Sequence, residues 1–267
     1  MEILGYIASV LIGISLGMLG SGGSILTVPV LVYLMHIDPL LATTSSLFIV
    51  GTTSLVGGLR AYSKKLVDFR AITEFGIPSI FSIFITRHYI LPALPDNMFS
   101  LGTTDISKSM FLMVVFALLM LIASVTMIRN TDNEQKAADS ESSRQNKVFP
   151  LVILGILVGF VTGLLGAGGG FLIIPSLVLF LRLPMKIAVG TSLLIIAINS
   201  LFGFLFSLKQ FEYNWTVLIV FTILAIGGIF FGSKIAEKIP GSSLKKGFGW
   251  FILAMGIYII IKEIFLK

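Results

Sequence analysis

The sequence predicts an all-α fold, a polytopic transmembrane helix bundle built from two homologous repeats. Its composition is the first reason: 56% of the 267 residues are hydrophobic, 12% are charged, and the mean hydropathy is +1.02. A soluble domain is about 45–50% apolar and about 25% charged. The other two reasons are a series of long uncharged runs and a segment that occurs twice. We therefore expect a multi-pass protein of the cell membrane, surrounded by a lipid bilayer.

Most of the uncharged runs have about the length of one membrane-spanning helix, which needs roughly 20 apolar residues. These runs are 40–59, 110–128, 187–208, 214–233 and 247–261. The run 75–86 has 12 residues and is extended at its front by 71–73 around Glu74. Two further runs, 3–35 and 148–181, are too long for one crossing and too short for two. Both carry a glycine cluster at the centre, so each is predicted to form two helical pieces joined by a break. Irregular backbone at membrane depth is tolerated where it is buried in protein or lines a cavity.

The glycine clusters belong to an internal repeat. Residues 17–31 (GMLGSGGSILTVPVL) match residues 163–177 (GLLGAGGGFLIIPSL) at 8 of 15 positions, with an offset of 146. The same offset aligns 42–58 with 188–204 at 7 of 17 positions. We therefore divide the chain into a first transmembrane repeat (1–128), a polar cytoplasmic linker (129–147) and a second transmembrane repeat (148–267).

The distribution of basic residues predicts how the repeats are oriented. If each repeat contributes five helical segments, the second repeat is inverted, and 14 Lys and Arg residues lie on the linker side against 5 on the other. Cytoplasmic loops carry the excess of Lys and Arg, so both termini are expected outside and the linker inside. Arg87 and Lys108 fall in outer loops in this scheme. A re-entrant hairpin in each repeat has the same parity, so the number of full spans stays open.

The glycine clusters are candidate substrate-binding segments. Glycine permits positive φ and a close approach of the backbone, and a helix that starts after glycines presents unsatisfied N–H groups to an anion. Ser24 or Ser21 can cap the first of these helices. Packing between helices is the alternative role, and we expect it for outer glycines such as Gly13 and Gly17. The candidate residues in the clusters are Gly22, Gly23, Ser24, Gly168, Gly169 and Gly170.

Hydroxyl and amide side chains in the following spans extend the candidate site. They can donate to an oxyanion without carrying a charge, although bonding to the backbone of the same helix is equally common. Thr53 and Ser54 are matched in part by Asn199 and Ser200 in the repeat. The candidates are Ser45, Ser46, Thr191, Ser192 and Asn199. No acidic or basic residue is expected deep in a span, and Glu74 is expected to pair with Arg70 at the interface.

Other functional classes fit the sequence poorly. The GSGGS segment lacks the lysine that follows a phosphate-binding loop, and no HExxH or Ser–His pattern points to an enzyme. The absence of cysteine excludes thiolate metal sites, and we expect no cofactor, no metal and no nucleic-acid partner. A structural membrane subunit that transports nothing remains an alternative, but it does not account for a duplicated helix break.

The duplicated motif resembles that of the TauE/SafE family of membrane permeases. Its G-x-x-x-G-x-x-G-x-G-G-x-x-x-x-x-P pattern occurs in both halves, at Gly13–Pro29 and at Gly159–Pro175. The resemblance implies a secondary transporter that moves small sulfur-containing anions, such as sulfite or organosulfonates, across the cytoplasmic membrane and often outward. It does not identify the substrate. Uptake of another small anion is the alternative. Direction, energy coupling and oligomeric state are not evident from the residues.

Overall fold

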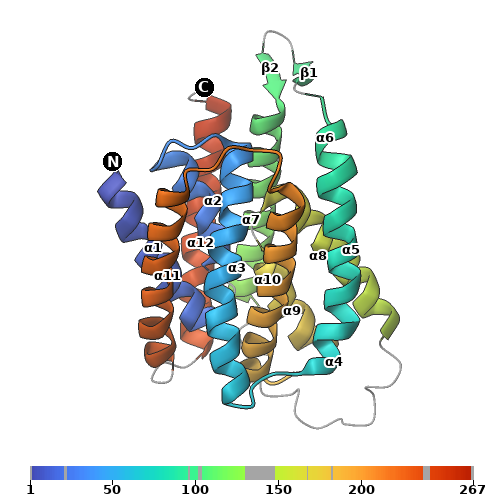
Figure 1. Cartoon of the computed structure of the whole chain (residues 1–267), viewed down its shortest axis with the longest axis vertical. Helices are drawn as coiled ribbons and strands as arrows, with labels where there is room; N and C mark the ends of the chain where they lie inside the picture. The colour runs from blue at the N-terminus through green and yellow to red at the C-terminus, as the bar shows by residue number, and fades with distance from the viewer. Residues whose placement is uncertain are drawn as a thin grey trace.

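The computed structural model is a bundle of long helices, whose first and last described residues lie at the same end (Figure 1). The structure describes residues 2–20, 23–95, 97–101, 104–129, 148–166, 168–181, 183–236 and 241–265. Most of the linker therefore lies outside the described residues, as does Gly22. Apart from one two-stranded hairpin, the regular elements in the described part are helical, which confirms the predicted class in its main feature.

The first half contains the two helical pieces of the over-long run, three further helical segments and the hairpin. Its elements are α1 (Glu2–Leu19), α2 (Ser24–Tyr33), α3 (Pro39–Ser63), α4 (Phe69–Ala71), η1 (Ile72–Gly76), α5 (Ile77–Ile85), η2 (Thr86–Ile90), α6 (Leu91–Ala93), β1 (Asn97–Leu101), β2 (Thr104–Ser107) and α7 (Lys108–Arg129). The two η elements are π-helical turns, so the segment from α4 to α6 is one continuous helical stretch. The β1–β2 hairpin is antiparallel and occupies the connection that precedes α7.

The second half repeats this order without the hairpin. Its elements are α8 (Val148–Leu165), α9 (Gly170–Phe180), α10 (Met185–Ser207), α11 (Trp215–Ala236) and α12 (Gly241–Phe265). The helix break predicted in each over-long run is present, between α1 and α2 and between α8 and α9. Gly20, Gly166, Gly168 and Gly169 have positive φ angles of 65–72°. Residues other than glycine rarely adopt this conformation, which explains the glycines at these four positions.

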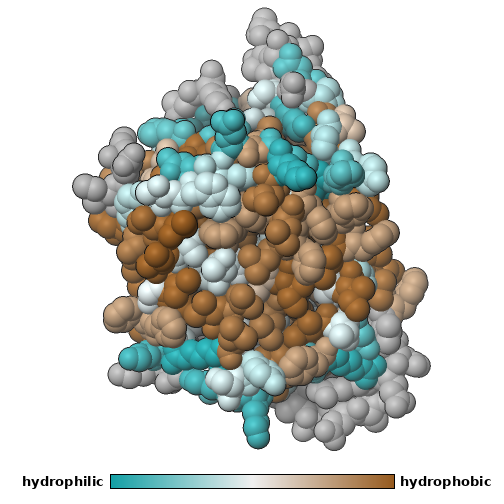
Figure 2. All heavy atoms as spheres, in the orientation of Figure 1, coloured by the Kyte–Doolittle hydropathy of each residue, from teal (hydrophilic) through white to brown (hydrophobic). Residues whose placement is uncertain are grey.

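Four of the described helices are long and apolar enough to cross a membrane: Pro39–Ser63, Phe69–Ala93, Lys186–Ser207 and Trp215–Ile235. Figure 2 shows a broad apolar band around the middle of the visible face, with polar residues gathered at both ends. Large apolar side chains such as Phe81, Ile223 and Phe231 are more than 60% exposed. An apolar surface of this extent is typical of a protein that is covered by lipid rather than by water.

Contacts between the halves are reciprocal at the sequence offset of the repeat. A Cβ atom built on Gly57 would lie 3.2 Å from Leu193, and one built on Gly203 would lie 3.1 Å from Leu47. Position 203 corresponds to 57 in the repeat, and position 193 corresponds to 47. Two tighter contacts are related in the same way. Gly13 packs against Ala225, and Gly159, which corresponds to position 13, packs against Ser79, which corresponds to position 225. Each half therefore uses equivalent positions to contact the other, as expected for a two-fold relationship between repeats.

Two equivalent helices, α3 and α10, pack against each other at the centre of this arrangement. Gly51 in α3 faces Leu201 in α10, and Gly57 faces Leu193, so residue numbers rise along one helix as they fall along the other. In Figure 1 the chain leaves α3 toward α4 at the lower end of the view, whereas it passes from α10 to α11 at the upper end. The two helices are therefore antiparallel.

The fourth segment of the first half is longer than the sequence predicts. The uncharged run ends at residue 86, but the helical stretch continues to Ala93 through the π-helical turn η2. This change corrects the location of Arg87, which was expected in an outer loop. Its side chain is instead fully buried inside the bundle. Burial here is decided by the helices that surround the turn, and a charge count along the chain does not include that information.

Candidate functional site

Four buried polar side chains, which we call the polar cluster, occupy equivalent positions on α3 and α10, the two helices that pack together. Thr53 and Ser54 belong to α3, and Asn199 and Ser200 occupy the equivalent positions in α10. All four residues are fully buried. The hydroxyls of Thr53, Ser54 and Ser200 and the amide nitrogen of Asn199 have no hydrogen-bond partner among the described residues. Because an unpaired buried polar group is destabilising, its occurrence at both pairs of equivalent positions indicates a ligand or water site.

The packing of the two helices brings these residues to the same level. Gly51 lies against Leu201 and Gly57 lies against Leu193. Thr53 and Ser54 are located between these two glycines along α3, and Asn199 and Ser200 are located between the two leucines along α10. Both pairs are near the middle of their helices, because α3 runs from Pro39 to Ser63 and α10 from Met185 to Ser207. The cluster therefore lies at mid-depth in the bundle.

Asn199 also contacts α5. Its Oδ1 atom lies 2.8 Å from Ser79 Oγ, which lies 2.8 Å from the carbonyl oxygen of Gly76 as well. The single serine proton can serve only one of these acceptors. If Ser79 donates to Gly76, the amide of Asn199 is better turned so that its nitrogen donates to Ser79. In either orientation one polar atom of Asn199 has no partner in the described chain.

The break between α8 and α9 borders the same cluster. A Cβ atom built on Gly168 would lie 3.0 Å from Ser200 Oγ and 3.1 Å from both Ile196 and Val50. The predicted residue Gly168 therefore lies beside the α3–α10 cluster. Gly169 is the N-cap of α9 and approaches Thr162, whose buried hydroxyl has no partner among the described residues. Gly170 is the first residue of α9, and no side chain caps this helix.

The break between α1 and α2 is described in part, since Ser21 and Gly22 lie outside the described residues. Gly23 is the N-cap of α2 and packs against the backbone of α1, where a Cβ atom would lie 2.2 Å from the carbonyl oxygen of Ile12. Ser24 is the first residue of α2 and is fully buried. Of the two serines predicted as possible caps, Ser24 lies inside the helix as its first residue, and Ser21 lies outside the described residues.

The remaining predicted hydroxyl residues lie at different levels of the bundle. Ser46 donates to the carbonyl oxygen of Gly166 or of Thr43 and so reaches the second break. Ser45 is buried one position earlier in α3. Ser192 donates to Val189 in its own helix, and Thr191 accepts from the backbone N–H of Asp68 at 2.9 Å. Ser192 is therefore bonded within its own helix and Thr191 to a residue of the other half, and their part in substrate binding stays a prediction.

A buried arginine is the functional candidate that sequence reasoning missed. Arg87 lies in the π-helical turn η2, a form of helix that is frequent at functional sites. Its Nη1 atom donates to Thr44 Oγ1 at 2.7 Å and to Ser207 Oγ at 3.3 Å. The repeat alignment contained a signal, because position 87 corresponds to Ser233, the last residue of an uncharged run. An equivalent position within a span argues against a loop.

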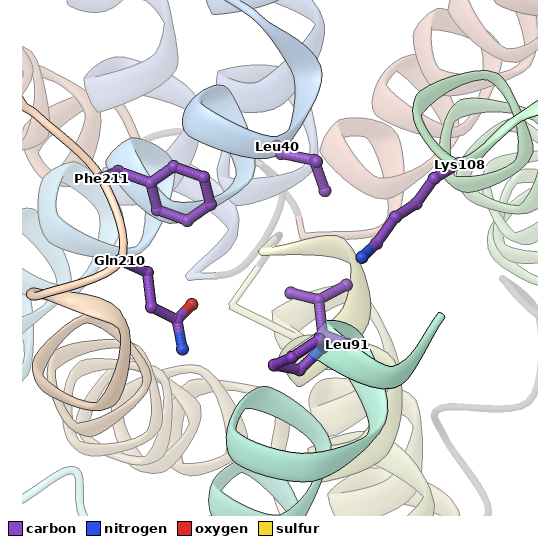
Figure 3. A pocket seen from close by; sticks show the side chains of 6 residues that line it. Leu40, Leu91, Lys108, Gln210 and Phe211 are labelled. Atoms are coloured by element: carbon purple, nitrogen blue, oxygen red, sulfur yellow. The ribbon is translucent and has the colours of Figure 1, made fainter. Parts of the chain in front are cut away.

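A pocket of about 340 Å³ opens one helical turn from this arginine. It is lined by Leu40, Leu91, Pro92, Lys108, Gln210 and Phe211, and Figure 3 shows the polar ends of Lys108 and Gln210 on opposite sides of it. Gln210 Nε2 lies 3.5 Å from the carbonyl oxygen of Arg87. Lys108 is largely buried and donates to the carbonyl oxygen of Leu94 at 3.2 Å.

Two acidic residues complete the description of charge in the bundle. Glu74 pairs with Arg70 at 2.6 Å, as predicted, and Arg70 is exposed. Glu263, near the end of α12, is 2% exposed and accepts a hydrogen bond from the hydroxyl of Tyr33 at 3.0 Å. Lys262 Nζ lies 4.2 Å from the centre of the Tyr33 ring. Neither acidic residue contacts the polar cluster of α3 and α10.

Comparison with known proteins agrees with this architecture. The family model described as sulfite exporter TauE/SafE matches residues 5–259. A probable membrane transporter protein of Xylella fastidiosa is 29% identical, over 94% of this chain and 91% of its own. The probable membrane transporter proteins MJ0441 of Methanocaldococcus jannaschii and YunE of Bacillus subtilis are both 26% identical, over 94% and 88% of this chain and 94% and 89% of their own.

No solved structure matches the chain. The family match nevertheless covers both halves, both helix breaks and the polar cluster between α3 and α10. The relatives are all named as membrane transporters. This chain is a membrane transporter and belongs to the TauE/SafE sulfite exporter family.

Proposed function

We propose that this protein exports small sulfur-containing anions, such as sulfite or organosulfonates, across the cytoplasmic membrane as a secondary transporter. The family description supports the substrate class and the direction. The proposed binding site rests on one observation. In the buried cluster of Thr53, Ser54, Asn199 and Ser200, each residue has a polar atom that lacks a partner in the described chain. A substrate with several oxygen acceptors would satisfy these groups at mid-depth in the bundle.

The site would be able to hold an anion without a charged side chain at its centre. Hydroxyl and amide groups donate hydrogen bonds, and the N-terminal end of a helix has roughly half a positive charge. The second break supports this arrangement, because Gly168 contacts Ser200 and the uncapped α9 begins two residues later. The predicted counterpart in the first half is the start of α2, after Gly22, Gly23 and Ser24. Discontinuous helices with this arrangement bind substrates in many secondary transporters.

We further propose that the two halves form an inverted repeat and operate by alternating access. The reciprocal contacts of Gly57 with Leu193 and of Gly203 with Leu47 support a two-fold relationship. The antiparallel course of the equivalent helices α3 and α10 supports inversion. α2 and α9 have 10 and 11 residues. At 1.5 Å per residue, both are too short to cross a bilayer core of about 30 Å, which supports re-entrant segments.

Counterflow in proteoliposomes tests this function. Purified protein is reconstituted with unlabelled sulfite inside, and the entry of radiolabelled sulfite is measured and compared with that of labelled sulfoacetate and of chloride. We expect transient accumulation of the sulfur anions above equilibrium and none in protein-free liposomes. Accumulation of another anion alone would favour the alternative of a different substrate. If no anion accumulates although the protein is folded and inserted, the transport proposal is wrong and a structural role is favoured.

A further inference from the structure

The guanidinium group of Arg87 is hydrogen-bonded to the protein through one nitrogen atom, and its other two nitrogen atoms are unpaired in the described part of the chain. Its Nη1 atom donates to Thr44 and Ser207. The Nε and Nη2 atoms are buried and have no hydrogen-bond partner among the described residues. These two atoms carry three N–H donors. They form the edge of the guanidinium group that binds two oxygens of a carboxylate or another oxyanion in parallel.

The charge of Arg87 is also without a counter-ion in the described part of the chain. Both groups that it bonds, the hydroxyls of Thr44 and Ser207, are neutral. The phenol of Tyr213 interacts electrostatically with Arg87 and donates to the backbone carbonyl of Ser207 at 3.0 Å. Burial raises the pKa of Tyr213 to about 12, so this phenol is neutral at physiological pH. An isolated buried cation is strongly unfavourable unless it is paired.

The pocket lies close to this group along two helices. Leu40 lines the pocket and lies one turn before Thr44 in α3, and Leu91 lines it one turn after Arg87. Lys108 and Gln210 supply its polar lining (Figure 3). The volume of about 340 Å³ is many times the ~30 Å³ that one water molecule occupies. The pocket is therefore large enough for a small anion, and Lys108 is part of its wall.

We propose that Arg87 binds the transported anion at a second position, between this pocket and the central polar cluster. Nε and Nη2 hold two oxygens of a sulfite or sulfonate group, while Thr44 and Ser207 hold the guanidinium in place through Nη1. Lys108 attracts the anion into the pocket. This inference rests on the proposed function, and it adds a charged binding step to a central site made of neutral donors. Since the side chain is 0% exposed, lipid headgroups are excluded as partners in this conformation.

The test separates binding at Arg87 from transport in general. Arg87→Gln removes the charge, Arg87→Lys keeps the charge without the two-oxygen edge, and Arg70→Gln is the control because Arg70 forms an exposed pair with Glu74. Sulfite counterflow is measured as a function of concentration for each variant. Thermal stabilisation of the detergent-solubilised protein by sulfoacetate and by chloride is measured in parallel.

We expect Arg87→Gln to raise the half-saturating sulfite concentration about tenfold or more and to abolish stabilisation by sulfoacetate. Arg87→Lys should lie between this variant and wild type, and Arg70→Gln should match wild type. An unchanged half-saturating concentration in Arg87→Gln would overturn the inference while leaving the transporter intact. Equal stabilisation by chloride and sulfoacetate would overturn recognition of two oxygens. If Arg87→Gln does not fold, the same comparisons are made with Arg87→Lys. Wild-type protein that transports no anion would instead refute the proposed function.

Discussion

The hydroxyl of Ser46 in α3 lies 2.5 Å from the carbonyl oxygen of Gly166, the residue that follows α8, and 2.8 Å from that of Thr43, and it donates to one of the two. Ser46 and Gly166 are 120 positions apart, and their contact joins the first half of the protein to the helix break of the second half. Gly166 also packs so tightly against Thr43 that a Cβ atom would lie 2.0 Å from the carbonyl oxygen of Thr43. The second break is therefore held against α3 by a side chain and by backbone packing.

We expect Ser46→Ala to lower the stability of the protein by about 1–3 kcal/mol, because the buried carbonyl of Gly166 loses the hydroxyl that can donate to it. Ser192→Ala is the matched control, since Ser192 occupies the equivalent position and donates only to Val189 in its own helix. Thermal unfolding in detergent measures both variants. Equal destabilisation by the two substitutions would show that the contact with Gly166 has no particular importance.

Helix packing in α1 and α11 gives a second prediction. A Cβ atom on Gly13 would lie 2.0 Å from the carbonyl oxygen of Ala225, whereas one on Gly227 meets nothing within 4 Å. Gly13→Ala should therefore force the two helices apart and cost about 1–3 kcal/mol. Gly227→Ala should be neutral or slightly stabilising, because alanine is the better helix former. The midpoints of thermal unfolding check this contrast, and a stable Gly13→Ala protein would contradict the packing.

The orientation of the repeats can be tested with single cysteines, because the natural chain contains none. Lys64 and Lys209 are exposed and follow equivalent helices, α3 and α10. An inverted repeat predicts that Lys64→Cys and Lys209→Cys react with a membrane-impermeant maleimide from opposite sides of the membrane. Labelling of intact cells and of inverted vesicles provides the measurement. Reaction of both cysteines from one side would rule out the inversion.

Sequence patterns predicted the elements whose physical basis is local. Glycine adopts the positive φ angles that occur at a helix break, so the glycine clusters predicted the positions of both breaks. The repeat offset predicted that Thr53 and Ser54 correspond to Asn199 and Ser200, and the structure shows that both pairs are buried with unpaired polar atoms. The ion pair of Arg70 and Glu74 followed from their spacing of four residues in a helix.

Features that depend on packing between distant segments could not be predicted in the same way. Arg87 follows an uncharged run directly, and a rule based on loop charge counts it as external. Its burial depends on Thr44 and Ser207, which come from two other helices. Thr191 was grouped with the site by its position in the repeat, yet its hydroxyl accepts a bond from the backbone of Asp68. A three-dimensional contact decides in both cases whether a polar group has a partner.

The central cluster leads to a prediction for Asn199. Asn199→Leu removes an amide that contacts Ser79 and has one unpaired polar atom. We expect sulfite counterflow to fall by at least tenfold, since a charge-assisted hydrogen bond contributes about 1.5–3 kcal/mol. Thr222→Val is a suitable control, because Thr222 is also buried but donates to Leu218 in its own helix. A similar loss in both variants would point to a general effect of removing polar groups.

Protection of a cysteine at position 200 by substrate tests the central claim most directly. Ser200→Cys places a thiol beside Gly168 in the polar cluster, and its reaction with a small methanethiosulfonate reagent is followed over time. Sulfoacetate serves as the protecting anion, because sulfite itself reacts with the reagent. We predict that the thiol reacts and that sulfoacetate slows the reaction in a saturable manner, while chloride does not. A thiol that reacts at the same rate with and without sulfoacetate would contradict an anion site between α3 and α10.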